Sequence, residues 1–213
     1  MGKSTSLATL CLAAVAIGLP LPAQVAQPRW FAGAAAGVFA LSPDSTIDIQ
    51  SEAASSSSYS ADLGPGFQLF AGRHLNNYLS LQGSYITHRN RLTIDTAGAG
   101  DPQGSRTNFA EDLRLHSAIG EVLFYVRPRR RAIRPFLTLG AGSMSGRSAR
   151  FSADLPALHF SVGVDVISRK GWAFRYMFNE TVARGNPVSR ALDPPGRRNL
   201  ISFQNVFGIV RHF

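Results

Sequence analysis

The sequence predicts an all-β chain that closes into an eight-stranded antiparallel barrel across a membrane. Three observations favour this fold. Eight segments alternate between apolar and small or polar residues, the connections between them alternate between short and long, and no further apolar run after the N-terminal one is long enough for a membrane-spanning helix. Because strand side chains point to two faces in turn, each segment has one greasy face and one small or polar face.

The first residues are typical of a secretory signal. Lys3 supplies a positive start, and the apolar run from Leu7 to Leu19 ends at Pro20. We expect residues 1–23 to be a signal peptide, with cleavage that could extend to residue 26, and residues 29–213 to form the barrel.

Length, charge and cysteine content limit the functions that the chain can have. The chain has 213 residues, a formal net charge of +9 and one cysteine, Cys11. This length suffices for one domain with a sizeable core, and a lone cysteine excludes an intramolecular disulfide. A basic balance can indicate nucleic acid, phosphorylated lipid or plain surface charge. We expect no nucleic acid partner, because the chain has an export signal and no nucleic-acid motif.

Each expected strand is a segment in which the alternation continues for roughly 10 to 15 residues, about the length of a tilted membrane-crossing strand. The segments are 29–41, 66–75, 78–91, 114–127, 134–146, 157–168, 172–183 and 199–213. The first contains FAGAAAGVFAL, whose small residues suit a narrow lumen.

The alternation is clearest in four of these segments. In the third, Leu79, Leu81 and Tyr85 oppose Ser80, Gln82 and Ser84. In the sixth, Leu158, Phe160, Val162, Val164 and Val166 oppose His159, Ser161, Gly163 and Asp165. In the seventh, Trp172, Phe174, Tyr176 and Phe178 oppose Ala173, Arg175, Met177 and Asn179. In the eighth, the apolar face carries Phe203, Phe207, Ile209 and Phe213. The opposite faces are poor in bulky side chains. This favours a barrel whose apolar faces point outward to lipid over one whose apolar faces pack into an interior core.

The connections indicate which way the barrel is oriented. Segments two and three join through Asn76-Asn77, four and five through a short Pro-Arg stretch, and six and seven through Lys170-Gly171. Long inserts rich in Gly, Pro, Ser and Asp separate the others, beginning with residues 42–65. Short periplasmic turns and long extracellular loops are typical of outer-membrane barrels. A soluble secreted β-barrel is the alternative.

Three stretches resemble a known family. They are WFAGAAAGVF at the first strand, RPFLTLGAG at residues 134–142 and FGIVRHF at the end. Together with the signal segment, they resemble small eight-stranded outer-membrane barrels of the OmpA/OmpX type, grouped as the porin-like outer-membrane β-barrel domain. The resemblance implies the outer membrane of a Gram-negative-type bacterium. It also implies that the barrel-assembly machinery reads the last strand, through Phe207, Ile209 and Phe213. Arg211 departs from the apolar residue usual there, and we expect it to face lipid.

Ionisable residues on the small-residue faces are candidates for a polar network in the lumen. They are Glu121, Asp165, Arg175 and His159, with Arg73 as a further candidate. Because an unpaired buried charge is costly, we expect these groups to pair and plug the barrel. A gated, narrow ion pathway is the alternative.

His159-Phe160-Ser161 resembles the catalytic pair of outer-membrane lipid A deacylases, in which His acts as base and Ser as nucleophile. In that family a Glu follows about a dozen residues later, whereas this chain has Ala173 there. We therefore expect no enzyme.

Arginines near the loop ends are candidates for contacts with lipid phosphate, because a guanidinium binds phosphate bidentately. They are Arg89, Arg91, Arg147, Arg150, Arg184, Arg190, Arg197 and Arg198. Solvated loop charge is the alternative. The cluster RPRRRAIR at 127–134 is interpreted as a solvated periplasmic turn.

The sequence thus predicts a non-enzymatic outer-membrane barrel with a structural, surface-interaction or adhesion role. We expect a monomer that contacts outer-membrane lipid and lipopolysaccharide. Neither metal-ligand spacing nor a cofactor motif is found. The alternatives are a narrow pore for small solutes or ions and, less favoured, a lipid A deacylase using His159 and Ser161.

Overall fold

The computed structural model describes residues 29–41, 56–97, 106–149, 152–168, 171–185 and 199–213. They form the strands β1 (Trp30–Leu41), β2 (Ser56–Ala61), β3 (Gly64–His74), β4 (Leu79–Ala97), β5 (Arg106–Tyr125), β6 (Ile133–Arg147), β7 (Ser152–Ile167), β8 (Trp172–Ala183) and β9 (Leu200–His212). The predicted signal segment lies outside the described residues. No helix long and apolar enough to cross a membrane occurs in the described part.

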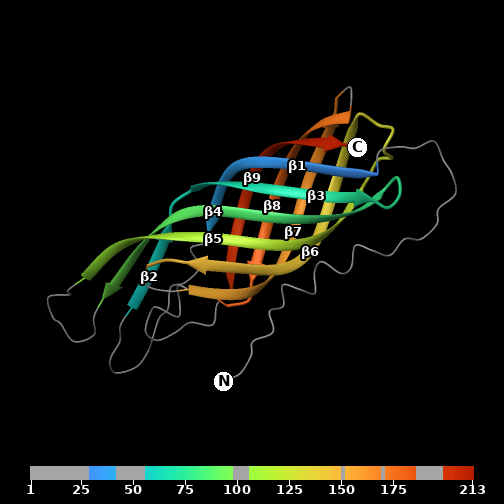
Figure 1. The fold of residues 1–213 in the computed structure, drawn as a ribbon. Helices are drawn as coiled ribbons and strands as arrows, with labels where there is room; N and C mark the ends of the chain where they lie inside the picture. Colours follow the sequence, from blue (N-terminus) through green and yellow to red (C-terminus); the bar gives the residue numbers. More distant parts are fainter. Residues whose placement is uncertain (1–28, 42–55, 98–105, 150–151, 169–170, 186–198) are drawn as a thin grey trace, which may run out of the picture.

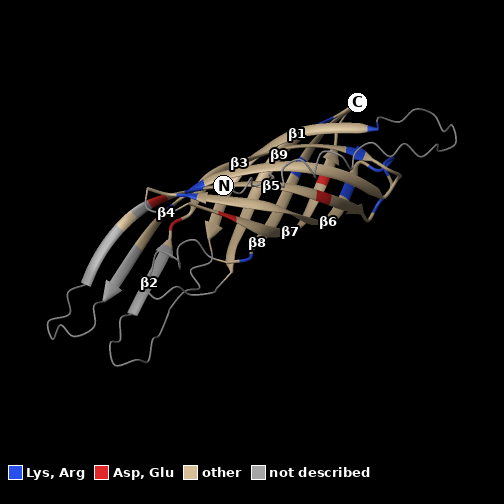
Figure 2. Cartoon of the chain, turned by 60° about the horizontal axis from the view of Figure 1, so that its bottom comes forward, with Lys and Arg blue, Asp and Glu red and all other residues tan. Residues whose placement is uncertain are grey.

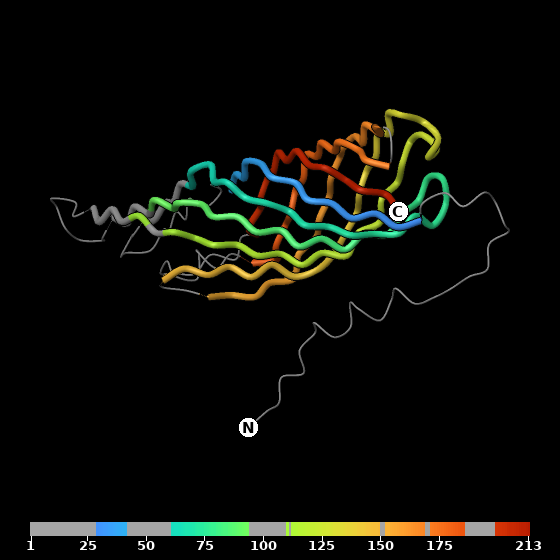
Figure 3. The backbone as a smooth tube through the Cα atoms, turned by 45° about the horizontal axis from the view of Figure 1, so that its top comes forward, coloured from blue at the N-terminus to red at the C-terminus, as the bar shows by residue number. Residues whose placement is uncertain are grey.

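Eight of these strands close into an antiparallel barrel, which confirms the predicted fold class (Figure 1). The first and last barrel strands, β1 and β9, run side by side at the seam (Figure 3), where Ala35 lies opposite Gly208. Backbone hydrogen bonds of 2.9 and 3.0 Å join Trp30 and Phe213 in both directions. Closure pairs the backbone all the way round, as lipid requires. We call the end with this seam edge and the short turns the periplasmic end, and the opposite end the outer rim.

Two strands are longer than predicted. β4 continues to Ala97 and β5 begins at Arg106, and the two pair along this whole extension. Since β6 stops pairing with β5 at Arg114, the hairpin projects beyond the barrel at the outer rim (Figure 1). Residues 92–113 were expected to be a loop, but pairing between the two strands extends the ladder through most of them.

A ninth strand, β2, was not predicted. Its sequence, SSSYSA, lacks the apolar alternation of a barrel strand. It pairs with β4 from Leu92 to Ala97, beyond the part of β4 that pairs with β3. The insert expected between β6 and β7 is also shorter than predicted. It covers only residues 148–151, because β7 begins at Ser152 rather than 157.

The greasy faces point outward, as predicted. Along β7, Leu158, Phe160 and Val162 are exposed while His159 and Ser161 are buried. Elsewhere on the outside, Phe174 of β8 is 65% exposed and Phe207 of β9 is 68% exposed. A soluble barrel would bury such rings, so the surface is that of a barrel surrounded by lipid.

The lumen holds more bulk than predicted. Large rings fill it, and each of three lies opposite a glycine of the neighbouring strand. The cross-strand pairs are Phe31 with Gly72, Phe70 with Gly33, and Phe136 with Gly163. A Cβ at Gly163 would lie 2.5 Å from the Phe136 ring, so the missing side chain makes room for the ring. The expectation that the inner face is poor in bulk was therefore wrong for these positions.

Candidate functional site: the polar lumen and the basic outer rim

Arg175 of β8 is the centre of the luminal polar network. It is fully buried and donates from Nε and Nη2 to the two carboxylate oxygens of Asp165, at 2.6 and 2.8 Å. The two residues lie directly opposite each other on β7 and β8. Arg175 also donates to Gln82 Oε1 at 2.8 Å and to the Tyr125 hydroxyl at 3.1 Å. The guanidinium thus binds both oxygens of the Asp165 carboxylate, and its further hydrogen bonds go to Gln82 and Tyr125. A pair with this geometry allows the two opposite charges to be buried inside the barrel.

Aromatic rings enclose the same guanidinium. Its Cζ lies 5.5 Å from the ring centre of Phe31, 4.8 Å from that of Phe70 and 4.9 Å from that of Phe136. Cation–π contacts of this kind stabilise a desolvated cation. The rings that occupy the space beside the glycines therefore also surround the central charge.

Glu121 and His159 lie in the same lumen. Glu121 is buried and accepts long hydrogen bonds of 3.4 and 3.5 Å from Gln82 Nε2. His159 Nε2 lies 3.9 Å from Glu121 Oε2, and its Nδ1 lies 2.9 Å from the Thr181 hydroxyl. Gln82 thus connects Glu121 with Arg175 and, through it, with Asp165. The structure brings together all four ionisable residues that the sequence placed in the lumen.

Neutral side chains extend this network, and the sequence analysis did not single them out. Gln68, Ser84, Asn179 and Gln204 are buried and joined by hydrogen bonds of 3.1 to 3.2 Å. Each occupies an inward position of its strand. The alternation of each strand predicts these inward positions, but it does not show which neutral side chains meet across the lumen. Among the described residues, no group of three His, Cys, Asp or Glu side chains is placed to hold a metal ion.

Arg73, a further candidate for the lumen, does not lie there. Its guanidinium lies 5.4 Å from the centre of the Trp30 ring, on the outer face near the periplasmic end. The register of β3 explains this, because Gln68, Phe70 and His74 are its buried positions. Arg73 lies one residue away from these buried positions, so its side chain points to the outer face.

His159 and Ser161 both face the lumen and have other partners. Ser161 shares a short hydrogen bond of 2.5 Å with Thr138, and His159 bonds Thr181. No hydrogen bond between His159 and Ser161 occurs among the described residues. The serine therefore has no adjacent base, and the pair faces away from the lipid in which a lipid A substrate would lie.

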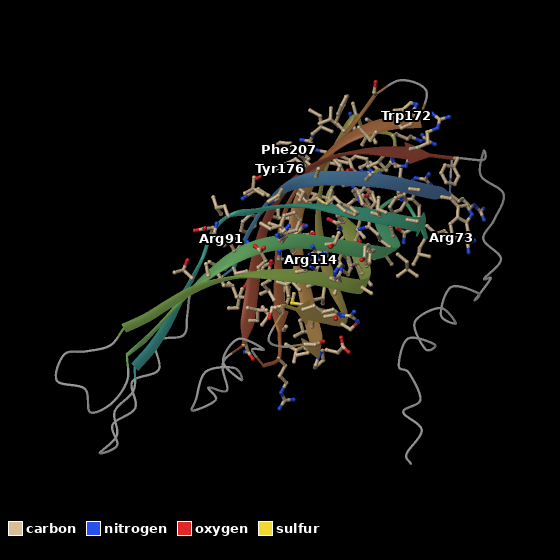
Figure 4. The ribbon with its side chains drawn as sticks, turned by 60° about the vertical axis from the view of Figure 1, so that its left-hand side comes forward. Arg73, Arg91, Arg114, Trp172, Tyr176 and Phe207 are labelled. Atoms are coloured by element: carbon tan, nitrogen blue, oxygen red, sulfur yellow. The ribbon has the colours of Figure 1, made fainter. Side chains whose placement is uncertain are left out.

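The outer rim carries a row of arginines on three neighbouring strands. Arg89 of β4 lies opposite Arg114 of β5, which lies opposite Arg147 of β6. All three are exposed. Arg91 lies one outward position further along β4, and Figure 4 labels it together with Arg114. Arg114, the first residue of the predicted segment 114–127, was not among the predicted phosphate contacts. We call Arg89, Arg91, Arg114 and Arg147 the rim arginines.

One carboxylate lies within this row. Asp112 is opposite Arg91 and forms an ion pair with Arg89. Like charges directly opposite on neighbouring strands destabilise a sheet. Because Asp112 offsets only one of the four rim arginines, the row keeps an excess of positive charge. Figure 2 shows basic positions near both ends of the barrel. Of the other predicted contacts, Arg184 is exposed at the end of β8. Arg150, Arg190, Arg197 and Arg198 lie outside the described residues.

The last strand presents the three apolar residues of the predicted assembly signal to the outside. Phe207, Ile209 and Phe213 are 68%, 50% and 61% exposed. Their recognition by the barrel-assembly machinery stays a prediction. Arg211 is on the same face, with its guanidinium 5.2 Å from the centre of the Trp172 ring.

Comparison with known proteins identifies the family. A family model described as the outer membrane protein beta-barrel domain matches residues 9–194. Among solved structures, Neisserial surface protein A is 13% identical, with a TM-score of 0.56, and the match covers 86% of this chain and 97% of that one. OprG of Pseudomonas aeruginosa is 14% identical, with a TM-score of 0.53 and coverage of 87% and 97%. Ail, the attachment invasion locus protein of Yersinia pestis, is 12% identical, with a TM-score of 0.50 and coverage of 88% and 100%.

A comparison with the curated proteins found no match. The likeness to the three solved structures concerns the fold, whereas the family model covers most of the chain. The chain therefore belongs to the outer membrane protein β-barrel family and is a small eight-stranded barrel of the outer membrane of a Gram-negative-type bacterium.

Proposed function

We propose that the chain is a non-enzymatic outer-membrane barrel with a closed lumen, and that its rim arginines bind the phosphate groups of lipopolysaccharide. The carrying observation is the direct cross-strand row Arg89–Arg114–Arg147. Repulsion between these neighbouring arginines costs free energy in the isolated protein. Binding of a polyanion across the row removes this repulsion and is therefore favourable. Planar guanidinium groups suit phosphate, which they can bind through two hydrogen bonds each.

The position of the row supports the choice of lipid over a soluble anion. On β4, the outward residues Leu81 and Tyr85 are exposed apolar groups, and Arg89 follows them towards the outer rim. A lipopolysaccharide molecule whose phosphate is held there would keep its acyl chains beside the apolar surface of the barrel. The ion pair of Arg89 with Asp112 is exposed on both sides, so it can be exchanged for a phosphate contact at small cost.

Reversing two rim charges is expected to weaken lipopolysaccharide binding. The variant Arg114→Glu/Arg147→Glu should bind lipopolysaccharide in neutral detergent about tenfold more weakly than the wild type, equal to about 1.4 kcal/mol. Affinity can be measured by titration with labelled lipopolysaccharide, with phosphate-free lipid A as the ligand control. Arg130→Glu/Arg131→Glu makes the same charge change in the periplasmic turn and should bind like the wild type. If both double variants bound lipopolysaccharide equally weakly, the loss of affinity would depend on net charge alone, and the proposal would be contradicted.

A narrow pore is the second candidate, and the packing of the lumen opposes it. Arg175, Asp165 and Gln82 are each at most 4% exposed, as are the rings of Phe31 and Phe136. We therefore expect the purified protein to show no discrete openings in planar bilayers. Openings whose conductance changes on Glu121→Gln would overturn the closed lumen, because Glu121 is buried within the barrel.

The lipid A deacylase is the candidate that the geometry supports least. His159 is fully buried and Ser161 is 7% exposed, both inside the barrel. A serine nucleophile needs a hydrogen-bonded base and access to its substrate. The inward position of both side chains, with Thr181 and Thr138 as partners, supplies neither.

A further inference from the structure

A second group of basic side chains meets at the periplasmic end of the lumen, away from the rim arginines. Arg134 of β6 is 1% exposed, although the sequence pattern predicted a solvated turn there. Its Cζ lies 3.7 Å from the centre of the Tyr125 ring, and its Nη2 donates a long bond of 3.5 Å to the Asn77 carbonyl. Its Nε has no hydrogen-bond partner among the described residues.

Arg129 lies in the turn between β5 and β6, which leads into Arg134. The backbone N–H of Arg131 donates a hydrogen bond of 3.0 Å to the carbonyl of Pro128 and so closes the turn. Within this turn, Arg129 is half-buried. Burial, followed by the charges of Arg134 and Arg29, lowers the pKa of Arg129 below its usual value. Arg129 therefore carries its charge at a half-buried position of the turn that leads to Arg134. At the same end of the barrel, the backbone oxygen of Arg29 accepts a hydrogen bond of 2.8 Å from the His74 amide.

Two histidines border the same place. His74 Nε2 lies 3.2 Å from His212 Nδ1, their rings stack, and His74 Nδ1 lies 2.7 Å from the Ser80 hydroxyl. His212 Nε2 is buried without a hydrogen-bond partner in the described part of the chain. His74 also lies 6.2 Å, ring centre to ring centre, from Tyr125, the ring that Arg134 covers. Two unpaired nitrogens therefore lie within one small cluster.

The nearby carboxylate is already engaged. Asp165 lies opposite Arg134 in the strand register, but it accepts hydrogen bonds from Arg175 and Tyr125. Among the described residues, no ion pair within 4 Å joins Arg29, Arg129 or Arg134 to a carboxylate. A buried polar atom without a partner normally has an explanation, such as an ion or ligand.

We propose that this mouth binds a phosphate-class oxyanion, held by Arg129 and Arg134 and bordered by Arg29 and His212. Phosphate fits because its several oxygens can accept from two guanidinium groups and an imidazole at once, and its charge offsets those of the arginines at this end of the barrel. The ligand is either free phosphate or the headgroup of an anionic phospholipid of the inner leaflet. The proposal is independent of the rim arginines, which lie at the other end of the barrel.

The test compares Arg129→Gln with Arg130→Gln. Both remove one arginine from the same turn, but Arg130 is exposed. The proteins are titrated with inorganic phosphate in neutral detergent at constant ionic strength, following ³¹P line width and the unfolding temperature. Wild type and Arg130→Gln should bind phosphate alike, and Arg129→Gln should bind about tenfold more weakly. Arg134→Met should show the same loss if it folds, while Arg129→Gln leaves the barrel strands untouched.

A second arm separates the two sources of phosphate. The proteins are placed in phosphatidylcholine nanodiscs with or without phosphatidylglycerol. Saturation by inorganic phosphate in neutral detergent identifies a free anion as the ligand. A response that appears only with phosphatidylglycerol, and is lost in Arg129→Gln, identifies a headgroup. Binding by Arg129→Gln that equals that of Arg130→Gln in both arms, or the absence of any response in the wild type, overturns the proposal.

Discussion

Replacing Arg175 by methionine should lower the free energy of unfolding by about 3–5 kcal/mol, because it leaves a buried charge without its partner. Arg175 is fully buried, and its two hydrogen bonds to Asp165 are 2.6 and 2.8 Å long. Methionine keeps most of the volume, so the loss reports the charge and its hydrogen bonds rather than a cavity. Urea unfolding in neutral vesicles, followed by tryptophan fluorescence, measures the change.

The double variant Arg175→Met/Asp165→Asn separates pairing from packing. Asparagine removes the orphaned carboxylate, so the double variant should be more stable than Arg175→Met alone. Arg130→Met, at an exposed turn position, should change stability by no more than about 0.5 kcal/mol. If Arg175→Met proved as mild as Arg130→Met, the lumen would not depend on the Arg175–Asp165 pair.

A second large effect is expected at Gly163. Its Cβ in Gly163→Ala would lie 2.5 Å from both the Phe136 ring and the backbone oxygen of Tyr176. The ring cannot yield freely, because it packs 4.9 Å from the Arg175 guanidinium and is 1% exposed. Overpacking of this kind should destabilise the barrel by about 1–3 kcal/mol, measured by the same urea unfolding.

Gly83→Ala is the matched control. Gly83 is exposed on the outer face of β4, and its Cβ would meet nothing within 4 Å. The same substitution there should be neutral, or stabilising by about 0.4–1 kcal/mol through the unfolded chain. Equal losses at the two positions would mean that glycine content, rather than the space that glycine leaves for Phe136, determines stability.

The properties that were predicted correctly are local ones. Alternation along residues 157–168 and 172–183 indicated which side chains face outward, because the period of a strand is two wherever the strand lies. The short connection before Trp172 likewise predicted that β7 and β8 form a hairpin, from a few adjacent residues. Outward residues such as Phe174 and Phe207 follow from this pattern without knowledge of any pairing partner.

The errors arose where pairing with another segment decides the outcome. β2 has no pattern of its own, and β4 supplies its hydrogen bonds. β4 and β5 extend each other beyond the barrel in the same way. Arg73 was a candidate for the lumen, although a register shifted by one residue puts it outside, and Arg134 was expected in solvent, although it lies within the barrel.

The candidate sites depend on this difference between local and long-range order. Composition and alternation were enough to predict a lipid-facing barrel with Glu121, Asp165, Arg175 and His159 available for its interior. The register between strands then determined that Gln82 joins these residues, that Arg114 completes the row at the rim, and that Arg134 covers the Tyr125 ring at the periplasmic mouth. Register is a relation between segments far apart in the chain, so it emerges only when the barrel closes.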